Sequence, residues 1–231
     1  LQGIERRNGT VRIGAMTRQA EVERDATVAD AVPLLARATP FIGHFQIRNR
    51  GTIGGSLAHA DPAAEYPAVA LALDAEFEVA NASGSRTVPA SEFFVSTFMT
   101  ALEADDVLSA VHFPAWQGRC GFAVEEVARR FGDFALTGAA CGVQLDSDDR
   151  VARAAIGMFG MGSTPLRAPE AEAAMTGRAI ADLDLEDVGR TAASQTDPPG
   201  DIHASAAYRS NVGAVVVARA LRRAVEEASS G

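Results

Sequence analysis

The residues best suited to chemistry in this sequence lie close together, between positions 48 and 65. Two adjacent glycines, Gly54 and Gly55, allow backbone amides to approach a ligand closely, and Thr52 and Ser56 place hydroxyl groups on either side. Glu65 adds a carboxylate. Amides in a turn can bind phosphate oxygens, and a carboxylate accepts hydrogen bonds from ribose hydroxyls. The segment favours a phosphate-rich ligand that carries sugar hydroxyls, although a Gly-Gly pair alone is also typical of a tight turn.

Other polar residues of this segment have weaker assignments. Arg48 and Arg50 are interpreted as residues that hold the segment or face a partner. Asp61 is predicted to cap a helix that begins at Pro62. For His59, a ligand contact and a structural role remain equally open. The segment has neither the G-x-G-x-x-G spacing of a Rossmann motif nor the G-K-[ST] triplet of a Walker loop.

Composition narrows the class of protein. The 231 residues are 47% hydrophobic and 22% charged, which is typical of a globular chain, and the net charge of −9 argues against nucleic acid as a partner. No apolar run approaches the length of a transmembrane helix. The two cysteines are too few for a disulfide framework or a zinc set, and Cys141 in a small apolar run is expected to be buried and inert. We therefore expect a cytoplasmic location.

The elements that must position the glycine-rich segment are predicted from periodicity and end signals. Pro114 ends one strand, so the boundary between two domains is expected near Ala115, with domains at 1–115 and 119–231. The fold class is α+β, mixed in the first part and a sheet followed by helices in the second. Before the boundary we predict helices at 17–23, 27–38 and 62–73, and strands at 11–13, 76–79, 86–88 and 107–114. After it we predict strands at 121–128, 137–145 and 151–159, and helices at 169–175, 185–195 and 206–228.

Charged residues in the second part are interpreted without a catalytic role. Glu125 and Glu126 lie on a predicted strand, and with Arg129 and Arg130 they are expected to be solvated or interface charges. His44, His112 and His203 have no companions at metal-ligand spacing, so no metal site is predicted.

Residues 42–65, which read IGHFQIRNRGTIGGSLAHADPAAE, closely resemble a signature of one protein family. Residues 88–94 and 125–135, and a helix opening at Tyr208-Arg209, match the same family in order, so that the resemblance covers essentially the whole chain. The family is the FAD-binding medium subunit of bacterial molybdenum hydroxylases, of the carbon-monoxide dehydrogenase and xanthine dehydrogenase type.

The resemblance implies both a fold and a set of FAD contacts. The fold is the C-terminal part of a FAD-binding domain of the PCMH type, followed by a small antiparallel sheet with helices. The residues Thr52, Ile53, Gly54, Gly55 and Ser56 are expected to form a loop on the FAD pyrophosphate and ribityl chain. Glu65 matches an acidic residue on the adenosine side, Leu108 matches an aliphatic residue near the isoalloxazine, and Ile42 lines the same cleft. His59 belongs to the same cleft segment.

The resemblance also implies an electron-transfer role without catalytic side chains on this subunit. A large subunit would carry the molybdenum cofactor and a small subunit two [2Fe-2S] clusters. Electrons would pass through the clusters to FAD on this subunit, and then to NAD⁺, a quinone or dioxygen.

One departure from the family concerns the start of the chain. In the family, a segment that precedes the position of Leu1 contributes a first glycine-rich loop to the diphosphate. The chain is therefore expected to lack half of the phosphate cradle, which leaves open that it binds FAD poorly or not at all by itself. A non-catalytic structural or assembly module is the alternative function, and a stand-alone flavin oxidase is the least favoured one.

Overall fold

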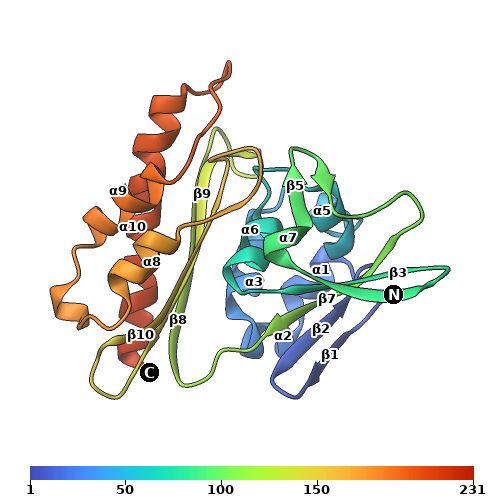
Figure 1. Cartoon of the computed structure of the whole chain (residues 1–231), viewed down its shortest axis with the longest axis horizontal. Coiled ribbons are helices and arrows are strands. Elements are labelled where there is room, and N and C mark those ends of the chain that lie inside the picture. Colours follow the sequence, from blue (N-terminus) through green and yellow to red (C-terminus); the bar gives the residue numbers. More distant parts are fainter.

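The computed structural model describes residues 1–231 and divides them between two antiparallel sheets (Figure 1). The first sheet has the strand order β1-β2-β7-β3-β4 and the second has the order β11-β10-β9-β8. The strands of the first sheet are β1 (Ile4–Arg7), β2 (Thr10–Gly14), β3 (Glu76–Asn81), β4 (Gly84–Pro89) and β7 (Val107–Pro114). Those of the second are β8 (Arg119–Ala128), β9 (Ala135–Leu145), β10 (Val151–Phe159) and β11 (Leu166–Arg167). The α+β fold class is confirmed.

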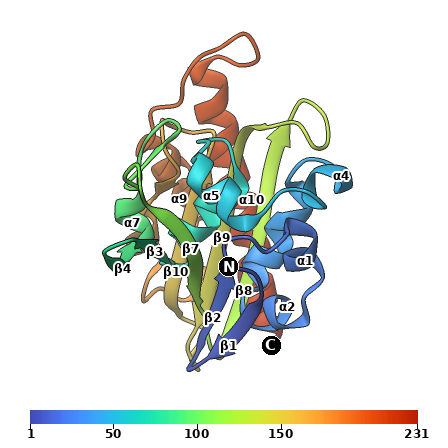
Figure 2. The same ribbon diagram turned by 90° about the vertical axis from the view of Figure 1, so that its right-hand side faces the viewer.

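Of the short helices of the first part, α3 and α6 pack against the second sheet; on its outer face lie α8 and α10, with α9 packed on them (Figures 1 and 2). The helices and turns of the first part are α1 (Gln19–Arg24), α2 (Ala26–Ala31), α3 (Pro33–Ala38), η1 (Thr39–Phe41), α4 (Phe45–Arg48), α5 (Ile53–His59), α6 (Glu65–Ala72) and α7 (Ala90–Phe93). A small hairpin, β5 (Phe94–Ser96) and β6 (Met99–Thr100), follows α7. The outer elements are α8 (Pro169–Met175), η2 (Ile180–Asp182), α9 (Leu185–Ser194) and α10 (Ala206–Ser230).

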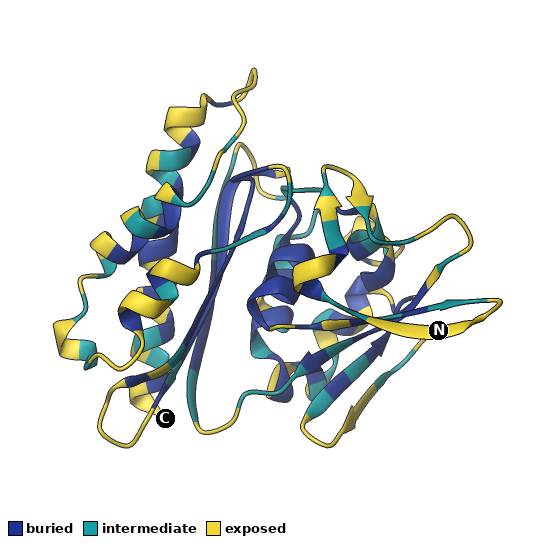
Figure 3. Ribbon diagram, viewed as in Figure 1, coloured by how far each residue is buried: buried dark blue, intermediate teal, exposed yellow.

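The central strand β9 is buried along almost its whole length (Figure 3). On one face, residues of the second sheet such as Phe122, Val124 and Phe159 pack with the first part of the chain in one continuous hydrophobic core. On the other face, Ala123, Cys141 and their neighbours pack against α10 in a second core. β9 is thus covered by both parts of the chain. The hydrophobic core is therefore continuous between the parts that precede and follow the connection from Pro114 to Arg119.

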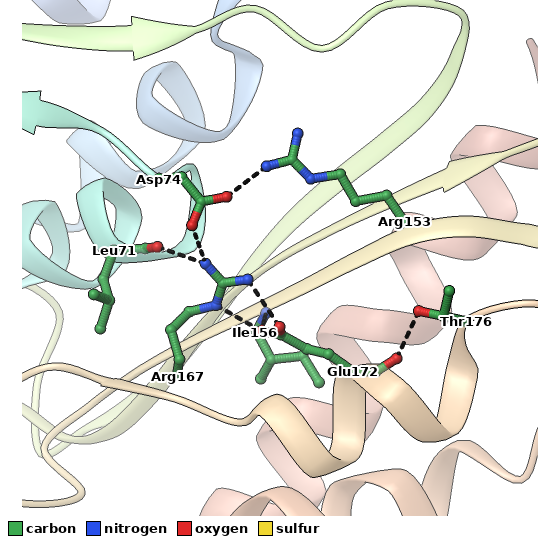
Figure 4. Close-up of polar contacts among 7 residues, drawn as sticks. All are labelled: Leu71, Asp74, Arg153, Ile156, Arg167, Glu172 and Thr176. Atoms are coloured by element: carbon green, nitrogen blue, oxygen red, sulfur yellow. Dashed lines mark hydrogen bonds and ion pairs between the residues drawn. The ribbon is translucent and has the colours of Figure 1, made fainter. Parts of the chain in front are cut away.

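Ion pairs tie the two parts together at the end of α6 (Figure 4). Arg167 donates to Asp74 at 2.7 Å and to the carbonyl of Leu71 at 2.8 Å, while also pairing with Glu172 at 2.7 Å. Arg153 donates to the other oxygen of Asp74 at 2.6 Å. Asp74 has a positive φ of 53°, a conformation that Asp and Asn tolerate better than most residues.

Two helix predictions and one capping prediction differ from the structure in an informative way. The helix predicted at 27–38 is two helices, because Val32 leaves the helical conformation and Pro33 begins α3 at a position where its missing N–H costs nothing. Asp25 caps α2 through hydrogen bonds from the amides of Thr27 and Val28. The helix predicted at 62–73 begins only at Glu65, and Asp61 is wrong as its cap, because its carboxylate accepts from the amide of Ala63 in a turn before the helix.

Candidate functional site

The glycine-rich segment is the start of a helix, so the prediction that it has a loop conformation is wrong. Thr52 is the N-cap of α5, and its hydroxyl accepts from the amide of Gly55 at 3.0 Å. The amide of Ile53 donates to the carbonyl of Thr17 at 3.0 Å, and that of Gly54 to the carbonyl of Ala15 at 2.8 Å. These three amides already have partners within the protein, so the first turn of α5 offers its hydroxyl groups rather than free amides.

The two glycines have different surroundings. A Cβ on Gly54 would lie 2.4 Å from the Cβ of Ala15 and 2.7 Å from its carbonyl oxygen, so the absence of a side chain lets α5 pack against the end of β2. A Cβ on Gly55 would meet only the hydroxyl of Thr52, at 2.9 Å, and Gly55 is exposed. Gly54 is therefore needed for packing of α5 against the first sheet, whereas Gly55 leaves the outer surface of α5 open to close approach by a ligand.

Leu108 lies one residue from the point where α5 is attached to the first sheet. The amide of Ala15 donates to the carbonyl of Ser109 at 2.9 Å, while the carbonyl of Ala15 accepts from Gly54. This chain of hydrogen bonds places the end of β7 that carries Leu108 next to the start of α5. The side chain of Leu108 is only 7% exposed and packs in the first core.

Ile42 is held by the buried guanidinium of Arg48. Arg48 donates to the carbonyls of Ile42 and Gly43, each at 3.1 Å, and its Nε and Nη2 atoms pair with Glu23 at 2.8 and 3.2 Å. Since these contacts fix the chain before α5, the prediction that Arg48 holds the segment is confirmed.

His59 lies at the end of α5 and is exposed. Its ring stacks on that of Phe98 with a centroid separation of 4.9 Å. Ala60 ends the helix with a positive φ of 52°. The contact with Phe98 gives His59 a structural neighbour and leaves its outer edge accessible.

Glu65 begins α6 and is almost fully buried, with 7% of its surface exposed. Burial raises the pKa of its carboxyl group to about 7, and the nearby charge of Asp61 contributes in the same direction. A carboxyl group that titrates near neutral pH inside a folded chain is typical of a functional site.

Glu126 was not among the predicted site residues, yet it shares the environment of Glu65. Burial raises its pKa to about 8, and the charge of Glu65 adds to the effect. Its Oε2 atom is buried and has no hydrogen-bond partner. The alternation of polar residues on β8 shows which face Glu126 occupies, but only the packed structure shows that this face is covered by the first part of the chain.

A cavity of about 590 Å³ lies between loops of the two parts. Asp61, Ala63, Thr97, Gly160, Asp201 and Arg209 are among its lining residues, and none of the nine predicted FAD contacts lines it. Arg209 is 5% exposed and pairs with Asp201 at 2.7 Å. Of the nine residues, Gly55 and His59 are exposed on α5, whereas Ile53, Gly54, Glu65 and Leu108 are buried.

Other expectations concern cysteines and charges. Cys141 is fully buried, as predicted, and burial raises the pKa of its thiol. Glu125 pairs with Arg223 of α10, while Arg129 and Arg130 are exposed.

No helix in the structure combines the length and the hydrophobicity that a membrane span requires.

Comparisons with known families cover nearly the whole chain. Residues 1–116 match the model described as the FAD binding domain in molybdopterin dehydrogenase. Residues 122–224 match the model described as the CO dehydrogenase flavoprotein C-terminal domain.

Individual relatives are similar to this chain over most of their own length. The chain is 40% identical to the 6-hydroxypseudooxynicotine dehydrogenase complex subunit alpha of Paenarthrobacter nicotinovorans, across 99% of this chain and 77% of that protein. It is 35% identical to the carbon monoxide dehydrogenase medium chain of Hydrogenophaga pseudoflava, across 97% and 78%. A solved carbon monoxide dehydrogenase from Hydrogenophaga pseudoflava superposes with a TM-score of 0.94 at 36% identity, covering 98% of this chain and 78% of that one.

Proposed function

The chain belongs to the FAD-binding medium subunits of molybdenum hydroxylases, and on that premise we propose that it transfers electrons within such a complex. In this proposal, electrons arrive from [2Fe-2S] clusters on a small subunit, after a molybdenum-cofactor subunit has oxidised the substrate. FAD supplies the step between one-electron carriers and an external acceptor such as NAD⁺, a quinone or dioxygen. The proposed location is the cytoplasm, where Cys120 and Cys141 would remain thiols.

Two features of the structure fit FAD. Gly55 is exposed, and a side chain at this position would fill the space next to the hydroxyl of Thr52. The hydroxyl of Ser56 makes no hydrogen bond within the protein. The Oε2 atom of Glu126 is buried without a hydrogen-bond partner, so it has hydrogen-bonding capacity that the protein itself does not use. We propose that Thr52, Gly55 and Ser56 contact the phosphate and ribityl part, and that Ile42, His59, Glu65 and Leu108 border the remainder.

The chain's own residues would bind and orient the flavin. The hydroxyl groups at the start of α5 would donate to phosphate oxygens, and the positive end of the helix would add a small attraction. The packing of Ile53 and Gly54 against β2 holds these groups in place without contacting the ligand. Because relatives named for different substrates share this architecture, we assign substrate selection to another subunit.

The observation that carries the proposal is the agreement of both family models with the two parts of the chain, and the exposed start of α5 at Gly55 supports it. Titration of the protein with FAD, followed by flavin fluorescence, tests it. We expect saturable binding. We expect Ser56→Ala to weaken it roughly fivefold, since one hydrogen bond contributes about 1 kcal/mol. Ser83→Ala, which removes a comparably small hydroxyl group from the exposed turn between β3 and β4, is the matched control.

One observation favours the alternative of a structural or assembly module. Three amides at the start of α5 are already bonded within the protein, which reduces the donors available for phosphate. A protein that assembles with its large and small subunits but takes up no FAD would support this alternative and exclude the flavin role.

A further inference from the structure

The central strand of the first sheet, β7, carries one extra residue next to Leu108. Glu78 of β3 is opposite Ala110 and Val79 is opposite Leu108, so Ser109 has no partner of its own on β3. An unpaired residue of this kind is a β-bulge, and the side chains beyond it change from one face of the sheet to the other. On the other side of β7, the pairing with β2 stays regular up to Ala110.

The bulge decides which face of the sheet Leu108 occupies. Val111 and Phe113 of β7 pack in the first core, so strict alternation would direct Leu108 to the opposite, outer face. Leu108 is instead 7% exposed and packs in that same core, together with Val79 opposite it. Because this end of β7 lies next to the start of α5, the bulge directs Leu108 to the side of the sheet on which the FAD contacts are proposed.

A carboxylate on the outer face of the sheet stabilises the bulge. The hydroxyl of Ser109 donates to Oε1 of Glu78 at 2.6 Å and lies 2.9 Å from the carbonyl oxygen of the same residue. Arg12 of β2 donates to both carboxylate oxygens, at 3.0 and 3.1 Å, and Nε2 of His112 lies 3.2 Å from Oε2. Because Arg12 and Ser109 donate to it, the pKa of Glu78 is lowered to about 2, and the carboxylate stays charged at neutral pH.

This cluster is more than an exposed ion pair, which would contribute little. One carboxylate connects β2, β3 and the extra residue of β7. Ser109 is only 6% exposed, so its hydroxyl would lose its partner inside the protein if Glu78 moved away. Glu76, two residues earlier on the same face of β3, is exposed and lies outside the cluster. The hydrogen bond from Ser109 therefore favours the bulged strand over a regular one.

We propose that Glu78 and Ser109 are positioning residues for the flavin. Their hydrogen bond stabilises the bulge, and the bulge presents Leu108 to the isoalloxazine ring. This assignment rests on the proposed FAD function, in which Leu108 borders the flavin, and it adds two residues that do not touch the cofactor. Bulges are over-represented next to active sites, where they redirect a side chain. Without the hydrogen bond, β7 could return to regular pairing, and this slip would turn Leu108 to the outer face.

A double-mutant cycle tests the proposal by titration of the protein with FAD. Ser109→Ala removes the hydroxyl and leaves the pair of Glu78 with Arg12 in place. We expect it to weaken FAD binding by up to roughly fivefold, the equivalent of one hydrogen bond. Leu108→Val shortens the side chain, keeps it apolar and should also weaken binding. Since Ser109 acts through Leu108, the double variant should lose less affinity than the product of the two single effects.

Two further measurements distinguish positioning of the flavin from a general loss of structure. The visible absorption band of bound FAD should shift in Ser109→Ala, because the ring loses a close apolar neighbour. The amide of Ala15 donates to the carbonyl of Ser109 at 2.9 Å, so its hydrogen exchange should be several-fold faster in the same variant. Unchanged exchange at Ala15 would show that the hydroxyl does not hold the bulge, and would refute the proposal without reference to FAD.

Substitutions of two glutamates on one face of β3 provide the comparison and the control. Glu78→Gln should act in the same direction as Ser109→Ala, because an amide cannot accept from Arg12 with both atoms and from Ser109 at once. Glu76→Gln is the matched control and should change none of these readouts.

The positioning role is overturned if Ser109→Ala leaves the affinity for FAD and its absorption band unchanged. It is also overturned if the effect of Ser109→Ala adds fully to that of Leu108→Val. Absence of FAD binding in the unaltered protein would overturn the proposed function itself, and is thereby distinguished from failure of the positioning role alone.

Discussion

Gly54 and Gly55 are adjacent in the sequence, but the structure gives their missing side chains different meanings. The space beside Gly54 is filled by Ala15, whereas the space beside Gly55 is bordered only by the hydroxyl of Thr52. The Gly-Gly pair has the sequence of a single ligand-binding feature, but its two residues have different roles. Gly54 allows close packing, and Gly55 lies at the surface.

This difference can be measured by substituting each glycine separately. Gly54→Ala should lower the free energy of unfolding by about 1–3 kcal/mol, because its Cβ would overlap the backbone and side chain of Ala15. Gly55→Ala should change it by less than about 1 kcal/mol, since alanine favours the helix and only a hydroxyl must shift. Gly55→Ala should instead weaken FAD binding. Urea denaturation and FAD titration of both variants check this, and equal losses of stability would contradict it.

At the scale of elements, α5 shows where prediction from sequence stops. Gly54 and Gly55 have low helix propensity and are typical of turns, so the sequence predicts no helix there. The helix forms because Thr52 caps it and because its first amides bond to carbonyls of Thr17 and Ala15, which are distant in sequence. Tertiary contacts of this kind leave no local signal.

Other elements were predictable for the opposite reason. The helix α8 begins with Pro169 and ends just before Gly177, and α10 follows the capping residue Ser205, so local signals specify their ends. For the site, the sequence identified Glu65 but not Glu126. The alternation on β8 distinguishes two faces and does not show what covers each one.

The contact between α10 and β8 depends on a single glycine. A Cβ on Gly121 would lie 1.9 Å from the carbonyl oxygen of Ala224 in α10, so any side chain there must push the helix away. Gly121→Ala should therefore lower the free energy of unfolding by more than about 2 kcal/mol.

Gly162→Ala is the matched control for this substitution. Its Cβ would meet the flexible end of the Leu166 side chain at 2.9 Å, so we expect a loss below about 1 kcal/mol. Thermal unfolding of the two variants measures the difference. If both variants lose the same stability, close packing at Gly121 is not what limits the position of α10.

At the scale of the whole molecule, Asp74 joins the two parts of the chain through Arg153 and Arg167. The guanidinium of Arg153 also lies 4.1 Å from the ring centre of Trp116, the single tryptophan, in the connection between the parts. Trp116 fluorescence therefore reports on this junction.

Asp74→Asn tests how far the junction couples the two parts. Asparagine tolerates the positive φ of this position, so the substitution removes the charge without straining the backbone. We expect a loss of about 1–2 kcal/mol, because Arg167 is partly buried and would keep only Glu172 as a carboxylate partner. Denaturation followed by Trp116 fluorescence and by circular dichroism measures it. Unchanged stability would show that the hydrophobic core alone joins the parts.

The burial of β9 between both parts also has a consequence for synthesis of the chain. The first part leaves the ribosome before the sheet that covers α6 has been made. At roughly 5–20 residues per second, the 45 residues between Pro114 and Phe159 take a few seconds to translate. During that interval the side of α6 that packs against β9 and β10 has no cover, and the nascent chain is expected to depend on chaperones that shield such surfaces.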